Sequence, residues 1–346
     1  MRTILTASKD ATIYQAFENN NAGLDEILEI GKVIDISGPT SSRAYATGSA
    51  RTLIYFDLPT TASVPSAAEY FLNLRIANAD NLKRNQKIVV YQVSRSWDEG
   101  SGYLYQDIKN VEDGASWTRC TSAVSWSNEG GDFLTSATSQ SITLSTYPLQ
   151  DIRVDVTNIL RPIVSQSLQN TFYGLALQFP TVDEQDYTNE GNIKVFSTET
   201  HTIHQPTLEI AWDDQTINTG SLLAIPTLNV KIVASNLRET YTKGDVDKIN
   251  LVVRDQYPVK SFDSVLRYKN KYYLPTSSYF SIMDAQSKTT VVPFDDYSKI
   301  STDRTGSYVI LDTSPLYSGR FYTLRVKVVN GTYSRILDTD TLFKVE

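Results

Sequence analysis

Residues 97–133 read WDEGSGYLYQDIKNVEDGASWTRCTSAVSWSNEGGDF and hold three of the four tryptophans of the 346-residue chain. Most other residues of this stretch are Gly, Ser, Asp, Asn, Glu or Tyr, which favours neither helical nor strand periodicity. Long segments of this kind are either functional loops or disordered, and the large aromatic side chains spread along this one argue against disorder. We therefore predict one structured loop, called the Trp loop below, that is pinned to a β-scaffold by its indoles.

The Trp loop has two interpretations. In the one we favour, the indoles are buried anchors that hold a segment with little else to fix it. In the other, it is a ligand or interface loop whose exposed rings stack on sugars while its carboxylates accept hydrogen bonds from hydroxyl groups. The candidate site residues are Trp97, Asp98, Glu99, Trp117, Trp126 and Asp132. A calcium ion bound by Asp98, Asp132 or nearby carbonyls is a further hypothesis.

Composition places the chain among soluble β-proteins. Hydrophobic residues make up 40% and charged residues 21%, and the 21 tyrosines favour strands. The net charge of −7, with no basic cluster, argues against a nucleic-acid partner. No segment approaches the roughly 18 apolar residues of a membrane span, and the polar start of the chain does not resemble a signal peptide. We expect a protein made and folded in a reducing cytoplasm, with no membrane partner.

The chain is long enough for two domains. Before residue 212, short strands alternate with turns, and residues 52–58 carry large side chains on both faces, as a central strand does. Residues 35–50 are expected to form a surface loop. One helix is expected after Thr157, which can cap it, with Ile159, Leu160, Ile163 and Val164 on one face and Pro162 weakening it. Scarce helix and frequent strands predict a two-sheet, jelly-roll-like sandwich over residues 1–212.

The polar segment 213–227 lacks periodicity and is predicted to be a linker. Residues 228–346 hold about seven strands, the size of an immunoglobulin-like sandwich. Two hairpins are expected there: Lys269-Asn270 would join strands at 264–268 and 271–274, and Asn330-Gly331 is the strongest hairpin signal in the chain. The predicted fold class is therefore all-β, with a jelly-roll-like sandwich followed by a smaller immunoglobulin-like sandwich.

Residues 8–212 resemble a DNRLRE domain through several motifs in the family's order. They are Asp10-Ala11-Thr12-Ile13, the Asn-rich turn at Asn21 leading to Gly31, Arg51 to Leu58, Trp97-Asp98-Glu99-Gly100, Trp117, Trp126 with Gly130-Gly131-Asp132, Asp155-Val156-Thr157, Gly174 to Leu177, Phe196 to Glu199 and Pro206 to Ile210. The resemblance implies a β-sandwich module of bacterial surface proteins, secreted proteins and phage virions, some members of which bind polysaccharide. Pro162 and Ile163 stand where the family usually carries a Trp.

The second half resembles a C-terminal module of tailed-phage structural proteins. The matching segments are Tyr279 to Asp284, Pro293 to Tyr297, Gly306-Ser307-Tyr308 and Phe343-Lys344-Val345. Together, the two resemblances imply a virion protein assembled in the host cytoplasm.

The residue pattern offers little support for catalysis. His201 and His204 are the only histidines, and residues three apart on a strand face opposite sides, so the pair is not expected to chelate a metal. Cys120 is the only cysteine and is expected to be a small buried hydrophobe. No nucleophile elbow or phosphate loop is present, and no pair of carboxylates stands out as a glycosidase site.

We therefore expect a non-enzymatic phage virion structural protein of the tail, baseplate, neck or capsid surface, with no cofactor. It would bind other virion proteins and form a homo-oligomer within a symmetric assembly, for which exposed tyrosines are suited. The alternative is a carbohydrate-binding module or adhesin whose Trp loop binds a host-surface glycan. A polysaccharide-degrading enzyme is the third and least favoured hypothesis.

Overall fold

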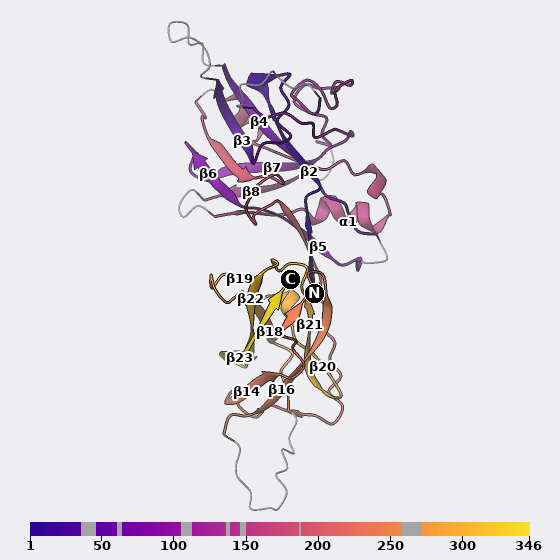
Figure 1. The fold of residues 1–346 in the computed structure, drawn as a ribbon, viewed down its shortest axis with the longest axis vertical. Helices are drawn as coiled ribbons and strands as arrows, with labels where there is room; N and C mark the ends of the chain where they lie inside the picture. Colours follow the sequence, from indigo (N-terminus) through magenta and orange to yellow (C-terminus); the bar gives the residue numbers. More distant parts are fainter. Residues whose placement is uncertain are drawn as a thin grey trace, which may run out of the picture. The chain divides into compact units, whose positions relative to one another are not determined.

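The computed structural model describes residues 1–35, 46–60, 64–104, 113–135, 139–145, 150–186, 188–257 and 272–346. These residues form two compact units, one of Ile4–Ile210 and one of Met1–Thr3 with Ala211–Glu346. Both consist largely of β-strands (Figure 1), which confirms the all-β fold class. Within the described ranges, no helix is long and apolar enough to cross a membrane.

The first unit is built on a four-stranded sheet, β1-β12-β5-β9, and an eight-stranded sheet, β6-β11-β3-β4-β10-β7-β8 with β2 paired to β4. Its strands are β1 (Arg2–Thr6), β2 (Lys9–Tyr14), β3 (Ile27–Asp35), β4 (Ala46–Tyr55), β5 (Glu69–Leu74), β6 (Ile76–Asp80), β7 (Gln86–Gln92), β8 (Gln140–Leu144), β9 (Ile152–Asp155), β10 (Leu175–Gln178), β11 (Asn192–Phe196) and β12 (Thr207–Ala211). The turn expected at Tyr147-Pro148 lies outside the described residues.

Strand β4 lies inside its sheet, as its two apolar faces predict. It pairs with β2, β3 and β10, and Leu53 and Ile54 are fully buried on opposite faces. The prediction of a surface loop at residues 35–50 is wrong for residues 46–50, which form the first half of β4, and Ala50 is buried. The small residues at these positions allow the strands to pair closely. Composition alone predicted a loop because the segment is rich in Ser, Gly and Thr. Residues 36–45 lie outside the described part.

Helix α1 (Thr157–Ser165) is the predicted helix, and the four predicted apolar residues are buried along it, with Pro162 inside. Thr157 does not cap it as expected. Its backbone N–H instead donates to Asp155 Oδ1 at 2.9 Å, and its hydroxyl accepts from the backbone N–H of Tyr70 at 2.9 Å. The short helix α2 (Thr181–Gln185) was not predicted, and the 3₁₀ turns of this unit are η1 (Gln15–Phe17) and η2 (Gln169–Thr171).

The second unit packs a four-stranded sheet, β14-β16-β21-β20, and a five-stranded sheet, β15-β23-β22-β18-β19, around one apolar core. Its elements are β13 (Leu223–Ala224), β14 (Val230–Ala234), β15 (Thr240–Tyr241), β16 (Val246–Asp255), β17 (Tyr272–Tyr273), β18 (Ser278–Asp284), β19 (Thr290–Val292), η3 (Asp296–Ser298), β20 (Ser301–Asp303), β21 (Gly306–Asp312), β22 (Arg320–Asn330) and β23 (Tyr333–Val345). Two sheets on one core form the immunoglobulin-like sandwich expected here.

The predicted hairpin at Asn330-Gly331 joins β22 to β23, with Gly331 at φ +62° as such a turn requires. The hairpin expected at Lys269-Asn270 and the strand at 264–268 lie outside the described residues. Of the strand expected at 271–274, Tyr272 and Tyr273 form β17, which pairs in parallel with β13.

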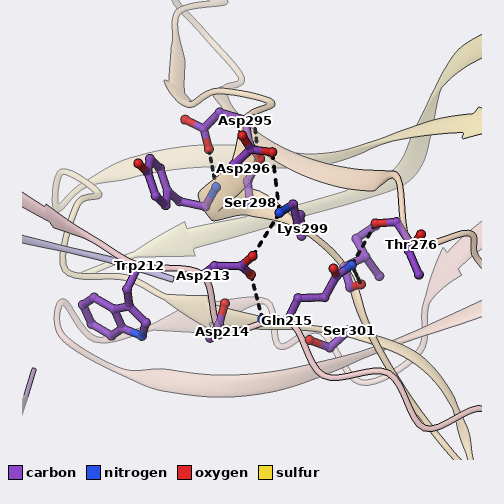
Figure 2. Close-up of polar contacts among 12 residues, drawn as sticks. Trp212, Asp213, Asp214, Gln215, Thr276, Asp295, Asp296, Ser298, Lys299 and Ser301 are labelled. Carbon is purple, nitrogen blue, oxygen red and sulfur yellow. Dashed lines mark hydrogen bonds and ion pairs between the residues drawn. The ribbon is translucent and has the colours of Figure 1, made fainter. Parts of the chain in front are cut away.

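The segment 213–227 is part of the second unit rather than the predicted linker. Lys299 Nζ lies 2.9 Å from Asp213 Oδ2, and the Gln215 amide donates to the carbonyls of Thr276 and Ile300 at 2.9 and 3.0 Å (Figure 2). Polar side chains that bond to distant segments of the same unit leave no hydrophobic periodicity, so sequence patterns did not indicate this attachment.

The first three residues also belong to the second unit, although sequence patterns placed them in the first. The α-ammonium group of Met1 donates to the Trp212 carbonyl at 2.6 Å and to Asp214 Oδ1 at 2.8 Å, and the Arg2 guanidinium pairs with Asp295. The chain therefore passes between the units at two places, Thr3/Ile4 and Ile210/Ala211.

Candidate functional site

The three tryptophans of the Trp loop are buried. Trp97, Trp117 and Trp126 expose 0%, 5% and 6% of their surfaces and belong to one apolar cluster. The Trp97 indole N–H donates to the Tyr173 carbonyl at 2.7 Å, and that of Trp126 donates to the Ser116 carbonyl at 2.8 Å. These indoles are the anchors that we favoured. Rings buried to this extent offer no face on which a sugar could stack.

The three acidic candidates of the loop serve different purposes. Asp98 is exposed, whereas the half-buried Glu99 accepts the backbone N–H of Asp10 at 2.8 Å. Asp132 is buried and accepts the backbone N–H groups of Ser127 and Asn128, each at 2.9 Å. Burial tends to raise the pKa of Asp132, but these amides and Arg95, 3.3 Å away, outweigh it and hold the pKa below its ordinary value. Asp132 therefore closes a turn.

Metal binding finds no support within the described ranges, where no three His, Cys, Asp or Glu side chains are grouped so as to hold an ion. His201 is 90% exposed and lies 3.5 Å from Glu26, while the ring of His204 lies 5.8 Å from that of Phe196. Both histidines follow β11 in a loop rather than on a strand. Cys120 is buried among the tryptophans, as predicted.

Asn21 connects the Trp loop to the N-terminal turn, and the sequence indicated it only as part of the Asn-rich turn, not as a site residue. Its buried side-chain amide donates to the carbonyls of Glu99 and Ala115 at 2.7 and 2.9 Å, and its oxygen accepts from the N–H of Gly102 at 2.8 Å. Gly100, at φ +83°, passes so close that a β-carbon there would lie 2.4 Å from Asn21 Oδ1. Close packing of backbone against this one amide explains part of the glycine content of the loop.

A cavity of about 530 Å³ opens beside the start of the Trp loop, within the first unit. Its aromatic wall is formed by Tyr55, whose ring stacks on that of Phe172 at 5.8 Å between centroids, and by the half-buried Tyr173. Polar groups complete the lining: Lys9, Asp57, Ser96, Gln169 and Asn170, with Leu58 and Trp97. Of these lining residues, the sequence indicated only Trp97 as a candidate site residue, because the others come from separate strands and turns.

Lys9 is the positively charged residue of the cavity lining. It pairs with Tyr55 across β2 and β4, its ammonium lies 4.3 Å from the Trp97 ring centroid, and it donates to the Trp97 carbonyl. Burial lowers the pKa of Lys9, while the carboxylates of Asp98, Glu99 and Asp57 act in the opposite direction. Burial also raises the pKa of Tyr55, and the Asp57 carboxylate adds to this.

A second surface feature lies on β22 and β23 of the second unit. Along β22, Tyr322, Leu324 and Val326 point into the core, so the alternate residues and their cross-strand partners on β23 face outward. This outward side, called the hairpin face, includes Phe321, Ile336 and Leu342, which expose 53%, 54% and 57% of their surfaces. Lys344 lies opposite Phe321 and Lys327 opposite Ile336, and the opposed Arg325 and Asp338 lie between Leu342 and Ile336.

Comparisons with known proteins assign no family. No family model matches the chain, and no curated protein matches it. Similar solved structures include β-glucuronidases of Parabacteroides merdae and Bacteroides uniformis, each 9% identical with a TM-score of 0.21, and a DUF4785 family protein of Legionella pneumophila, 8% identical with a TM-score of 0.19. The alignments cover 99%, 100% and 99% of this chain but only 36%, 35% and 66% of those proteins. Likeness this slight assigns neither fold nor activity.

Proposed function

We propose that the protein is a non-enzymatic structural component of a tailed-phage virion, acting through contacts with other virion proteins. Its place would be the tail, baseplate, neck or capsid surface, within a symmetric assembly that includes further copies of the chain. The observation that carries this proposal is the hairpin face, where three large apolar side chains are more than half exposed on regular strands.

Apolar side chains on the outer face of a sheet contribute nothing to the core of their own domain. An interface typically has an apolar centre and a polar rim. Phe321 and Leu342 occupy neighbouring positions on the hairpin face beside Lys344, and Ile336 lies farther along it, beyond the opposed Arg325 and Asp338. Burial against a neighbour would remove these side chains from water, and because only about half of each is still exposed, each would contribute roughly 0.8–1.5 kcal/mol before the costs of association. The resemblance of the second half to a module of tailed-phage structural proteins, and of the first half to a module that phage virions share with bacterial surface and secreted proteins, supports the same conclusion.

The alternative, a carbohydrate-binding module that uses the Trp loop, loses its main support because the three indoles are buried. The polysaccharide-degrading hypothesis gains none, since Glu99 and Asp132 accept hydrogen bonds from backbone amides and Asp98 is exposed.

The proposal is tested with particles and variants together. Phage particles assembled with the wild-type chain should contain it by mass spectrometry, whereas Phe321→Glu and Leu342→Glu should fold normally but fail to incorporate. Val252→Glu is the matched control, because Val252 is also an exposed apolar residue of the second unit but lies on β16 of the other sheet. Absence of the chain from particles, or equal incorporation of all variants, would refute the proposal.

A further inference from the structure

Two opposite charges lie at the middle of the hairpin face. Arg325 of β22 and Asp338 of β23 are directly opposite each other in the sheet. They lie between the apolar pair Phe321 and Leu342 at one end of the face and Ile336 at the other. Opposite charges at facing positions of neighbouring strands usually stabilise a sheet by pairing with each other. In this sheet the two side chains do not pair, so the face presents both charges separately.

The Arg325 guanidinium leans toward β18 instead of toward β23. It donates to Ser281 Oγ and Thr290 Oγ1, each at 3.4 Å, and its centre lies 5.7 Å from the ring centroid of Phe294. Its buried Nε has no hydrogen-bond partner among the described residues. Asp338 is exposed and forms no ion pair with any residue that the structure describes. Hydroxyl groups and a ring do not neutralise a guanidinium, so both charges are available to a partner.

We propose that the partner of the hairpin face is the hairpin face of a second copy of this chain, in a symmetric dimer. This rests on the function proposed above, because it names the neighbour at the same surface. The two-fold axis runs along the strands, between β22 and β23, so that β22 of each copy covers β23 of the other. Residues that are opposite each other within one sheet then meet across the interface. Arg325 of each copy therefore meets Asp338 of the other, once on each side of the axis.

A two-fold contact requires one surface to be complementary to itself, and the charges select this orientation. With the axis across the strands, β22 would cover β22 of the second copy, and Arg325 would meet Arg325 while Asp338 met Asp338. Juxtaposed like charges disfavour such an arrangement strongly. Only the axis along the strands brings the two signs together at the centre of the face.

The apolar side chains fit the same orientation. An axis along the strands leaves each end of the face in place, so the end that carries Phe321 and Leu342 meets the same end of the second copy. Four large apolar side chains then form one cluster beside the two ion pairs. Phe321 also covers the aliphatic part of Lys344 of the second copy, because these two positions are opposite each other in the sheet.

Self-association is measured on the full chain by sedimentation velocity over a wide range of concentrations at physiological salt. Wild type should dimerise, and Arg325→Glu and Asp338→Arg should each weaken the dimer by about tenfold or more, because each variant places like charges in contact twice. Arg254→Glu is the matched control, since Arg254 is exposed on β16 of the other sheet. It should leave the dimer unchanged.

Mixing the two weakened variants tests whether the charges pair between chains. The Arg325→Glu chain then offers two acids where the Asp338→Arg chain offers two bases, so the mixture should dimerise although each variant alone does not. Pairing within one chain cannot produce this recovery. The double variant, with both changes in one chain, should dimerise alone. Circular dichroism confirms folding, and Asp338→Arg, at an exposed position, keeps the test valid if the half-buried Arg325→Glu does not fold.

Three results would overturn the dimer: a wild-type chain that stays monomeric at every concentration, a dimer indifferent to both charge reversals, or a mixture that fails to recover. These outcomes are distinct from the test of the proposed function. Particles that contain the chain, while the purified chain stays monomeric, would overturn the dimer and leave the virion role in place. A charge-dependent dimer of a chain that is absent from particles would do the reverse.

Discussion

The Trp loop and the hairpin face show opposite uses of large apolar side chains. In the Trp loop, an irregular segment rich in polar residues turns its three indoles inward, and its backbone is bonded to Asn21, Asp132 and its own turns. On the hairpin face, a regular two-stranded segment turns Phe321, Ile336 and Leu342 toward solvent. The segment that looks most like a binding loop is thus mainly a folding device, while an ordinary alternating strand pair carries the exposed surface.

The physical reason is whether a segment satisfies its own backbone hydrogen bonds. Strands β22 and β23 satisfy their amides by pairing with each other, so their outward side chains are free to serve another purpose. The described residues of the Trp loop form only isolated bridges, so their large side chains and buried polar groups must hold them in place. Mutations should therefore affect folding in the Trp loop and association on the hairpin face.

The largest effect is expected from Trp97→Ala. Removing a fully buried indole leaves a cavity and frees the Tyr173 carbonyl, which should lower the free energy of unfolding by about 3–5 kcal/mol in chemical denaturation. Phe321→Ala, which truncates an exposed ring, should cost no more than about 0.5 kcal/mol. Equal losses in the two variants would remove the distinction between the regions.

Asn21→Ala should have the next largest effect. It leaves the Glu99 and Ala115 carbonyls without their donor, a loss of about 1–3 kcal/mol for each buried group left unsatisfied. Hydrogen exchange should rise within the Trp loop, around Gly102 and Ala115, before it rises elsewhere. Asn170→Ala, at an exposed asparagine, is the control and should leave both stability and exchange unchanged; a Trp loop that stays protected in Asn21→Ala would contradict its role as a connector.

A pH dependence follows from Asp10, beside the Trp loop. Burial, with the nearby Glu99 and Glu199 carboxylates, raises its pKa from 3.8 to about 8. One oxygen accepts from the Thr198 N–H at 2.8 Å and the other has no hydrogen-bond partner among the described residues. The folded state therefore keeps a proton that the unfolded state releases, and this contribution is full below pH 3.8 and is lost as pH rises to about 8.

Asp10→Asn isolates this contribution. The free energy of unfolding of the variant relative to wild type should rise steadily between about pH 4 and pH 8 and then level off. Unfolding midpoints across that range provide the measurement. Parallel curves for the two proteins would contradict a raised pKa of Asp10 in the folded state.

The smallest effect on stability is expected on the hairpin face. Phe321→Glu and Leu342→Glu change exposed positions, so their free energies of unfolding should stay within about 0.5 kcal/mol of wild type. Their incorporation into particles should nevertheless fail. A large loss of stability instead would mean that these side chains support their own domain.

Much of the fold followed from local sequence patterns. The two-faced strand around Leu53, the apolar side of α1 and the Asn330-Gly331 turn were predictable because each depends on residues close in the chain. The attachment of Met1–Thr3 and of residues 213–227 to the second unit was not predictable, because it depends on ion pairs and side-chain hydrogen bonds between distant segments.

The candidate sites followed the same rule. The burial of Trp97, Trp117 and Trp126 as anchors was anticipated, since a segment without a regular ladder needs large side chains inside. The cavity was missed because Lys9, Asp57 and Asn170 come together only when separate strands and turns are folded. The hairpin face was missed because Phe321 and Leu342 directly precede the buried Tyr322 and Phe343 in the chain, so the sequence alone does not show that they face outward.

The most direct test is cross-linking mass spectrometry of purified phage particles that contain this chain. Lys327 and Lys344 lie on the hairpin face, opposite Ile336 and Phe321, and provide reactive amines at its edge. We expect cross-links from these two lysines to other virion proteins or to further copies of the chain, and their loss in Phe321→Glu. Cross-links confined to lysines of the first unit, or particles without the chain, would contradict the account.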